Sequence, residues 1–152
     1  MSWDSKTIID DVTKEYNTYK LPSFGDEEET PFESLRECSK EELQNLFFQF
    51  SQQKIYIEEI KAIRESDLHI QQGTYDQEYQ IALYNISKEY KDKGIKKPTQ
   101  DELKAEVMAK NQQLRDMNKK IIHNKSLLIR VKGLSEKVST KYFTTKDFLN
   151  RL

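Results

Sequence analysis

The chain of 152 residues contains few of the residues that break or cross-link a backbone: one cysteine, 4 glycines and 3 prolines. Sheet-rich folds need many turns, and turns draw on glycine and proline, so a sandwich or a barrel is not expected. No glycine-rich joint between a strand and a helix occurs, which argues against a doubly wound α/β fold. The sequence therefore predicts an all-α protein with long amphipathic helices.

The sequence also predicts neither a disulfide within the chain nor a membrane-spanning helix. Cys38 is the only cysteine and has no partner for a disulfide within the chain, which fits a reducing compartment. No apolar run approaches the roughly 20 residues that cross a bilayer. The first residues, Met-Ser-Trp-Asp-Ser-Lys, lack the apolar core of a signal peptide. We expect a cytoplasmic protein without membrane contact, located in the host cytoplasm if a phage encodes it.

Charge is abundant and unevenly distributed. Charged residues make up 34% of the chain and hydrophobic residues 36%, and the net charge is -1. Residues 1–34 carry 3 basic and 9 acidic side chains, whereas residues 95–152 carry 14 basic and 6 acidic ones. We therefore divide the chain into an acidic N-terminal arm of one helix and a linker, 1–34, and a helical domain, 35–152, whose C-terminal half is basic.

Apolar spacing and capping residues predict the first helices. A short helix is expected over 4–19, followed by an acidic linker at 26–31. Ser39 and Glu42 form a capping box, in which each side chain accepts a hydrogen bond from the other residue's backbone. This box begins a second helix that we expect to end near residue 66.

A polar break with a glycine tip is expected next. Residues 68–73 end in Gln-Gln-Gly, and Thr74 with Gln77 forms a second capping box, which predicts a third helix from residue 74. Gly94 fits the left-handed position that follows the last residue of that helix.

The last long helix has the clearest start. Pro98 prevents continuation of the third helix, and Thr99 with Glu102 forms a third capping box. The third and fourth helices then form an antiparallel hairpin. We expect the fourth helix to run to residue 138, with Gly133 as a candidate for a kink or an early end, and a short helix to follow from Thr144.

One stripe of the fourth helix has a coiled-coil-like spacing of apolar residues, interrupted by polar Lys110, Asn124 and Ser135. The stripe is longer than the third helix covers, so part of it meets another segment or another copy of the chain. We expect a homo-oligomer. The seam consists of Val107, Leu114, Met117, Ile121, Leu128 and Val131.

Residues for catalysis or metal binding are scarce. His69 and His123 are the only histidines, and neither has a second histidine or a cysteine at metal-ligand spacing. The carboxylates form solvated runs, and neither a P-loop nor a GxGxxG motif is present. We therefore expect no enzyme, no metal site and no cofactor.

The basic side chains of the C-terminal half instead indicate an anionic partner. A ridge of lysines attracts phosphate backbones, and Tyr142 and Phe143 next to it are able to stack on unpaired bases. Arginine is rare in the ridge, so we expect binding without sequence preference. The alternative is a solvated helix face that neutralises the acidic arm of a neighbour. The candidate residues are Lys54, Lys61, Arg64, Arg115, Lys119, Lys120, Arg130 and Lys132.

Four features in residues 40–138 resemble the UvsY-like recombination mediators of tailed phages. They are Lys61-Ala62-Ile63-Arg64 before a polar glycine tip, a tyrosine-rich helix that ends in Glu-Tyr-Lys-Asp-Lys-Gly94, the joint that starts at Lys96-Lys97-Pro98, and a long helix up to Lys132-Gly133-Leu134. The acidic N-terminal arm departs from that pattern.

The resemblance implies a helical protein that forms ring-like homo-oligomers and binds single-stranded DNA. Such proteins help to load a RecA-type recombinase onto strands covered by single-strand-binding protein. The family's DNA contacts correspond to Lys61 and Arg64. Two other hypotheses stay open: a phage or bacterial assembly protein whose acidic arm docks on a neighbouring subunit, and a helical adaptor that binds a partner helix.

Overall fold

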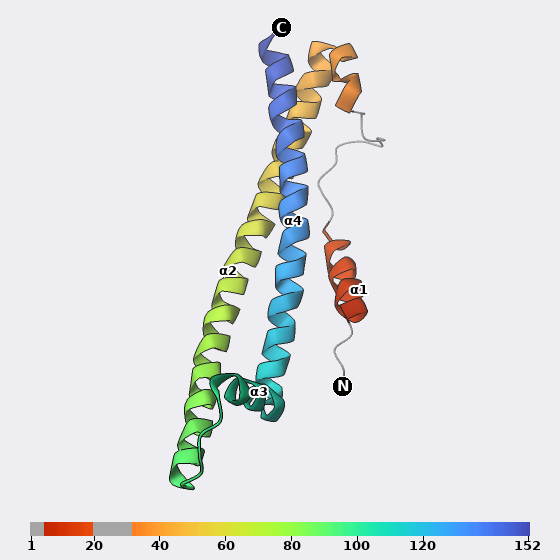
Figure 1. The fold of residues 1–152 in the computed structure, drawn as a ribbon. Coiled ribbons are helices and arrows are strands. Elements are labelled where there is room, and N and C mark those ends of the chain that lie inside the picture. The colour runs from red at the N-terminus through yellow and green to blue at the C-terminus, as the bar shows by residue number, and fades with distance from the viewer. Residues whose placement is uncertain (1–4, 20–31) are drawn as a thin grey trace. The chain divides into compact units, whose positions relative to one another are not determined.

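The computed structural model describes residues 5–19 and 32–152, and all regular elements in these ranges are helices (Figure 1). The predicted all-α class is therefore confirmed. The expected linker at 26–31 lies outside the described residues. The elements are α1 (Ser5–Tyr16), the 3-10 helix η1 (Phe32–Glu37), α2 (Lys40–Asp92), α3 (Gln100–Lys110) and α4 (Gln112–Asn150).

Helix α2 is continuous for 53 residues, so the predicted break at 68–73 is wrong. Gly73 lies within the helix, and the Thr74 hydroxyl donates to the Ile70 carbonyl at 2.9 Å instead of capping a new helix. A single glycine costs a helix about 1 kcal/mol, and tertiary contacts on both sides, from Gln71 to Asn124 and from Tyr75 to Met108, help to offset that cost. The expected second and third helices are thus one helix, and no glycine tip follows Lys61 and Arg64.

The end of α2 and the start of α3 match the prediction. Gly94 has a φ of 65° and follows the last turn of α2. Its N–H bonds the Lys91 carbonyl at 3.1 Å, and the N–H of Ile95 bonds the Tyr90 carbonyl at 3.2 Å, which is the Schellman pattern. Thr99 caps α3, because its hydroxyl oxygen accepts from the Glu102 N–H.

The expected fourth helix is interrupted at Asn111, which has an extended backbone between α3 and α4. Its side-chain oxygen accepts from the Leu114 N–H at 3.0 Å and so caps α4. The Arg115 guanidinium donates to the carbonyls of Met108 at 2.8 Å and Ala109 at 2.6 Å, at the C-terminal end of α3. This corner is therefore held by side-chain bonds to both helix ends.

Downstream of the corner, α4 is uninterrupted. Gly133 neither kinks nor ends it, and the short helix expected from Thr144 is the last part of α4. A Cβ added at Gly133 meets nothing within 4 Å, so no close packing depends on this glycine.

The chain divides into two compact units. Unit 1 comprises Met1–Glu65 and Ser126–Leu152. Its core contains Val12 from α1, Ile57 from α2, and Leu127, Val131 and Val138 from α4. Helix α1 therefore contributes to this core.

Unit 2 comprises Ser66–Lys125, which includes the later part of α2, all of α3 and the first part of α4. Leu103, Val107 and Leu114 are buried in it. A polar pair joins two of its helices, because the Asn124 side-chain amide donates to the Gln71 side-chain oxygen at 2.5 Å. Unit 2 thus combines an apolar core with a directional polar contact.

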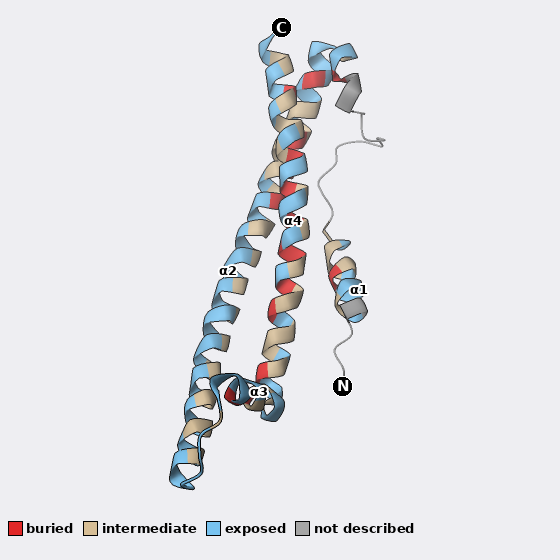
Figure 2. Ribbon diagram, viewed as in Figure 1, coloured by how far each residue is buried: buried red, intermediate tan, exposed pale blue. Residues whose placement is uncertain are grey.

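The predicted seam is buried within one chain. Val107, Leu114, Ile121, Leu128 and Val131 are all buried, and Met117 is half-buried (Figure 2). Because the chain's own helices cover these side chains, a second copy is not needed to do so. The assignment of this seam to an oligomer interface therefore loses its basis.

Among the described residues, none of the helices combines the length and the apolar character that a bilayer crossing requires.

Candidate nucleic-acid interface

The eight basic residues selected from the sequence do not form one patch. Five of them belong to unit 1 and three to unit 2. Arg64, on α2 in unit 1, donates to the Glu15 carboxylate at 2.6 Å and to the Tyr19 hydroxyl at 2.8 Å. Both acceptors come from α1 or the residues just after it, so Arg64 attaches the N-terminal segment to α2.

Arg130 holds the same segment from α4. Its guanidinium donates to the Thr13 hydroxyl at 2.9 Å and lies over the Tyr16 ring, 5.8 Å from the centroid. Lys132 is 3.8 Å from the Glu65 carboxylate in a mostly exposed pair, which contributes little. Arg130 is therefore engaged within unit 1, whereas the side chain of Lys132 remains 49% exposed.

Lys54 packs on aromatic rings at another part of unit 1. It pairs with Glu58 at 2.5 Å and lies 5.8 Å from the centroid of Tyr142 and 6.0 Å from that of Phe143. Tyr142 in turn stacks on Phe47 at 5.0 Å. The ring expected to stack on bases is thus already stacked within the protein, whereas Phe143 remains exposed.

Three of the eight residues have neither an ion pair nor a side-chain hydrogen bond or ring contact in the part of the chain that the structure describes. Lys61 and Lys119 are half-buried and Lys120 is exposed. Arg115 lacks an ion pair too, but its guanidinium is occupied at the corner between α3 and α4. The sequence-selected set therefore leaves few free cations, and these lie on different units.

A denser group of lysines lies at the end of α2 and in the loop after it, within unit 2. Glu89 and Asp92 are the only acidic residues between the first and last of these lysines. All five lysines are exposed, and none has an ion pair within the described residues. We call this group the lysine-rich end; it consists of Lys88, Lys91, Lys93, Lys96 and Lys97.

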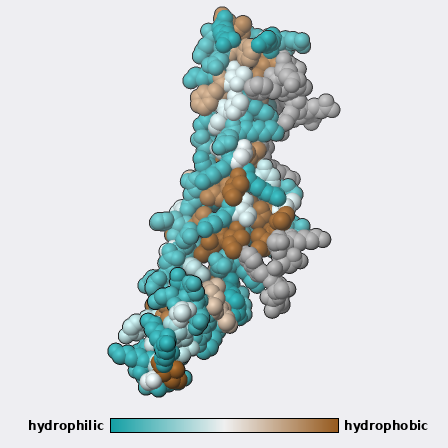
Figure 3. Space-filling model, viewed as in Figure 1, coloured by the Kyte–Doolittle hydropathy of each residue, from teal (hydrophilic) through white to brown (hydrophobic). Residues whose placement is uncertain are grey.

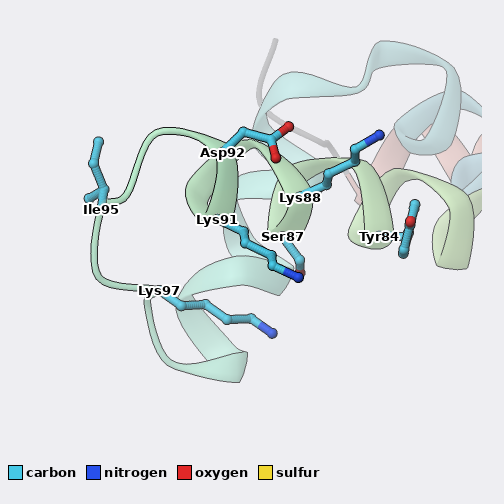
Figure 4. Close-up of a pocket in the computed structure, with 7 residues that line it drawn as sticks. All are labelled: Tyr84, Ser87, Lys88, Lys91, Asp92, Ile95 and Lys97. Atoms are coloured by element: carbon cyan, nitrogen blue, oxygen red, sulfur yellow. The ribbon is translucent and has the colours of Figure 1, made fainter.

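A hollow of about 520 Å³ opens at the lysine-rich end. In Figure 4, the side chains of Lys91 and Lys97 extend side by side toward Ser87, whereas Asp92 points away from them. Tyr84 and Ile95 supply the apolar part of the lining. The surface visible in Figure 3 is mostly hydrophilic at the end of α2, with a small hydrophobic patch. The hollow thus offers ammonium groups next to an aromatic ring.

Next to the lysine-rich end, α2 and α3 are joined by hydrogen bonds to the Glu106 carboxylate. The Tyr90 hydroxyl donates to one carboxylate oxygen of Glu106 at 2.8 Å, and Lys110 donates to the other at 2.6 Å. These two hydrogen bonds lower the pKa of the Glu106 carboxyl, and the bond from Lys110 has the larger effect. The bond to Glu106 also raises the pKa of Tyr90. The carboxylate is therefore held charged between two donors.

Each of these lysines fits an ordinary local role when it is taken alone. The negative C-terminal end of a helix favours cations in and near its last turn, which suits Lys91 and Lys93. Lys96 and Lys97 belong to the joint before Pro98. The signal that identifies the group is its density, five lysines in ten residues, together with a Schellman turn that folds the loop back beside the helix.

The thiol of Cys38 is not activated as a nucleophile. Burial first, and then a hydrogen bond with Glu42, raise the pKa of the Cys38 thiol, which disfavours the nucleophilic thiolate. Within 5–19 and 32–152, no group of three or more histidine, cysteine or acidic side chains is placed to hold a metal ion.

Comparison with known proteins adds no assignment. The chain matches no family model, no curated protein and no solved structure.

Proposed function

We propose that the protein binds single-stranded DNA without enzymatic activity and that the lysine-rich end is the contact surface. The observation that carries the proposal is the exposure of all five lysines at this end, without ion pairs among the described residues. Unpaired surface ammonium groups attract phosphates and release the counterions of the nucleic acid on binding. Lysine acts here as a point charge, which favours the backbone over base edges.

Unpaired bases fit the apolar part of the same site better than a duplex does. Tyr84 is 67% exposed and lines the hollow with Lys88 and Lys91. A base stacked on an aromatic ring gains about 1–3 kcal/mol whatever its identity. In a duplex the bases are already stacked on each other, so this gain is available only to single strands.

The resemblance to recombination mediators supports the wider role that we propose. In that role the protein helps to load a RecA-type recombinase onto DNA covered by single-strand-binding protein. The contact residues differ from those that the resemblance implied, because Arg64 is occupied by Glu15 and Tyr19. The proposal therefore moves the DNA contact from Lys61 and Arg64 to the lysine-rich end.

The test is fluorescence anisotropy with a labelled oligothymidine over a salt series. A triple variant, Lys91→Ala, Lys96→Ala and Lys97→Ala, is expected to lose affinity on the order of tenfold or more at low salt. The plot of log K against log salt has a negative slope, and its magnitude should decrease by about 2, because the variant loses three phosphate contacts and each contact on a single strand contributes roughly 0.7.

The matched control removes three exposed lysines elsewhere: Lys104→Ala, Lys137→Ala and Lys146→Ala. It changes the net charge by the same amount, so a general charge effect would weaken both variants equally. Equal affinities of the two triple variants, or no binding of the native chain at about 50 mM salt, would contradict the proposal.

The assembly hypothesis receives no comparable support. It needs the acidic arm to dock on a neighbouring subunit, but α1 contacts its own chain through the Glu15–Arg64 pair and through buried Val12. Glu15 and the buried side of α1 around Val12 are thus already used within unit 1, whereas the acidic residues at 26–29 lie outside the described residues.

A further inference from the structure

The part of α2 within unit 2 has two faces of different character. Its inner face contacts the rest of the unit, for example where Gln71 accepts from Asn124 and where the Tyr75 hydroxyl meets the Met108 sulfur at 3.5 Å. On the opposite side, Ile70 and Ile81 are 63% and 48% exposed. The helix thus keeps large apolar side chains on the side that its own unit does not cover.

These apolar residues belong to one continuous stripe. At 3.6 residues per turn, the six residues of the stripe fall within a sector of about 100°, which is the width of a helix contact face. We call it the outer face; it consists of Ile70, Gly73, Thr74, Gln77, Ile81 and Tyr84, all of them exposed. None of the six residues is charged, although charged residues make up 34% of the whole chain. The cores of protein interfaces are depleted of charge in the same way.

The outer face is self-complementary in an antiparallel pair, because matching positions lie at equal distances before and after Gln77. Ile70 and Tyr84 are each seven positions from Gln77, and Gly73 and Ile81 are each four positions from it. In an antiparallel pair related by a two-fold axis at Gln77, Ile70 therefore faces Tyr84 of the other copy. Gly73 leaves room for Ile81 of that copy, and the two Gln77 amides are able to hydrogen-bond each other.

The charges at the ends of the stripe favour the same arrangement. Asp67 lies ten positions before Gln77 and Lys88 lies eleven positions after it. In the antiparallel pair, Asp67 of each copy approaches Lys88 of the other, so unlike charges meet at both ends. A parallel pair in register would place Asp67 next to Asp67 and Lys88 next to Lys88.

We propose that a second copy of this chain docks antiparallel on the outer face and forms a two-fold dimer centred on Gln77. From Ile70 to Tyr84 the contact is only about 21 Å long at 1.5 Å per residue. A contact of this length is short for a stable interface, which buries roughly 800 Å² per partner, so we expect the dimer at micromolar concentration and above. Formation of the dimer does not require DNA, but the dimer uses Tyr84 and Lys88, which also belong to the proposed DNA site, so DNA and a second copy compete for these two side chains. The interface differs from the buried seam of α4.

Sedimentation velocity of the full chain at about 5–200 µM tests the dimer, with the expected weight-average mass rising across this range. Gly73→Gln should keep the chain monomeric, because a Cβ added at Gly73 meets nothing within 4 Å in one chain, whereas the longer side chain collides with Ile81 of the second copy. Ile81→Lys should do the same. The control Ile129→Lys makes the same change at an exposed position of α4 and should leave dimerisation unchanged.

Charge exchange tests the orientation. Asp67→Lys and Lys88→Asp should each weaken the dimer, because each places like charges together at both ends, and the double variant should restore it. Circular dichroism of each variant verifies that the helices remain. A native chain that stays monomeric up to about 200 µM, or a double variant weaker than both single ones, overturns the proposal.

Engineered cysteines in a Cys38→Ser background separate the two orientations. Gln77→Cys lies on the proposed axis, where the two Cα atoms approach within the roughly 7 Å that a disulfide spans, so oxidation should give a covalent dimer. Ile70→Cys should not cross-link with itself. If both variants cross-link equally, the pair is parallel and the proposed interface is wrong.

Discussion

Glu15 and Arg64 lie 49 positions apart in the sequence and form an ion pair of 2.6 Å in unit 1. The same guanidinium donates to Tyr19, so it has two acceptors from the N-terminal segment. Arg64 therefore has a structural role that explains its charge without a nucleic acid.

We expect Arg64→Ala to lower the free energy of unfolding by about 1 kcal/mol, because it removes one ion pair and one further hydrogen bond. The value is modest since the two side chains are 26% and 31% exposed. Urea denaturation measures it. Lys61→Ala, one turn earlier on α2 and without an ion pair among the described residues, is the control and should change stability by less. An Arg64→Ala protein of native stability that has lost DNA affinity would favour the DNA-contact role instead.

Two threonines with similar sequence surroundings should respond differently to alanine. Thr99→Ala removes the cap of α3 and should cost about 1 kcal/mol. Thr74→Ala lies inside α2, where alanine is the better helix former, so stability should stay the same or rise slightly. Thermal melts of the two variants provide the comparison. A large loss for Thr74→Ala would indicate that a helix begins there after all.

The polar pair of Asn124 and Gln71 should behave as a unit. Asn124→Leu leaves the Gln71 amide without its partner and should cost about 1–2 kcal/mol. Adding Gln71→Leu removes the second polar group as well, so the double variant should recover most of the loss. Urea denaturation of the native chain, the two single variants and the double variant gives the four free energies of unfolding that a double-mutant cycle compares. Additive losses would show that the two side chains do not interact.

The Glu106 carboxylate should make unit 2 sensitive to acid. The pKa of Glu106 is lowered in the folded state. The ionised carboxylate therefore stabilises the fold at pH values above the ordinary glutamate pKa of about 4.3. That contribution is lost as the pH falls through the lowered pKa. Carbon-13 NMR of the carboxyl group gives the pKa directly. We expect Lys110→Ala to raise it more than Tyr90→Phe does, since the bond from Lys110 is the larger cause. The reverse order would contradict this ranking.

Local signals predicted the joint between α2 and α3 correctly. Gly94, Pro98 and Thr99 each restrict the backbone through their own chemistry, so their effect does not depend on the rest of the fold. Thr74 and Asn111 are different. Both residue types cap helices, yet Thr74 lies inside a helix and Asn111 caps one. Packing decides between these outcomes, because the corner at Asn111 is completed by Arg115 bonds to the preceding helix, which short spacings do not reveal.

The candidate site was harder to predict than the helices, for a related reason. The sequence shows that Arg64 and Arg130 are charged, but their acceptors lie 45 to 117 positions away. Contacts at such separations are known only once the chain is folded. The lysine-rich end was accessible from the sequence in principle, since its five lysines are close together. What the structure adds is their exposure and the position of Tyr84 beside them.

The discontinuity of unit 1 has a consequence for synthesis on the ribosome. Thr13 and Arg130 are 117 positions apart, and unit 1 needs both Met1–Glu65 and Ser126–Leu152. Unit 2, by contrast, is a single stretch, Ser66–Lys125. During synthesis, the middle unit is therefore complete before the partners of α1 on α4 have been made, so α1 is synthesised before this unit but reaches its full set of contacts after it.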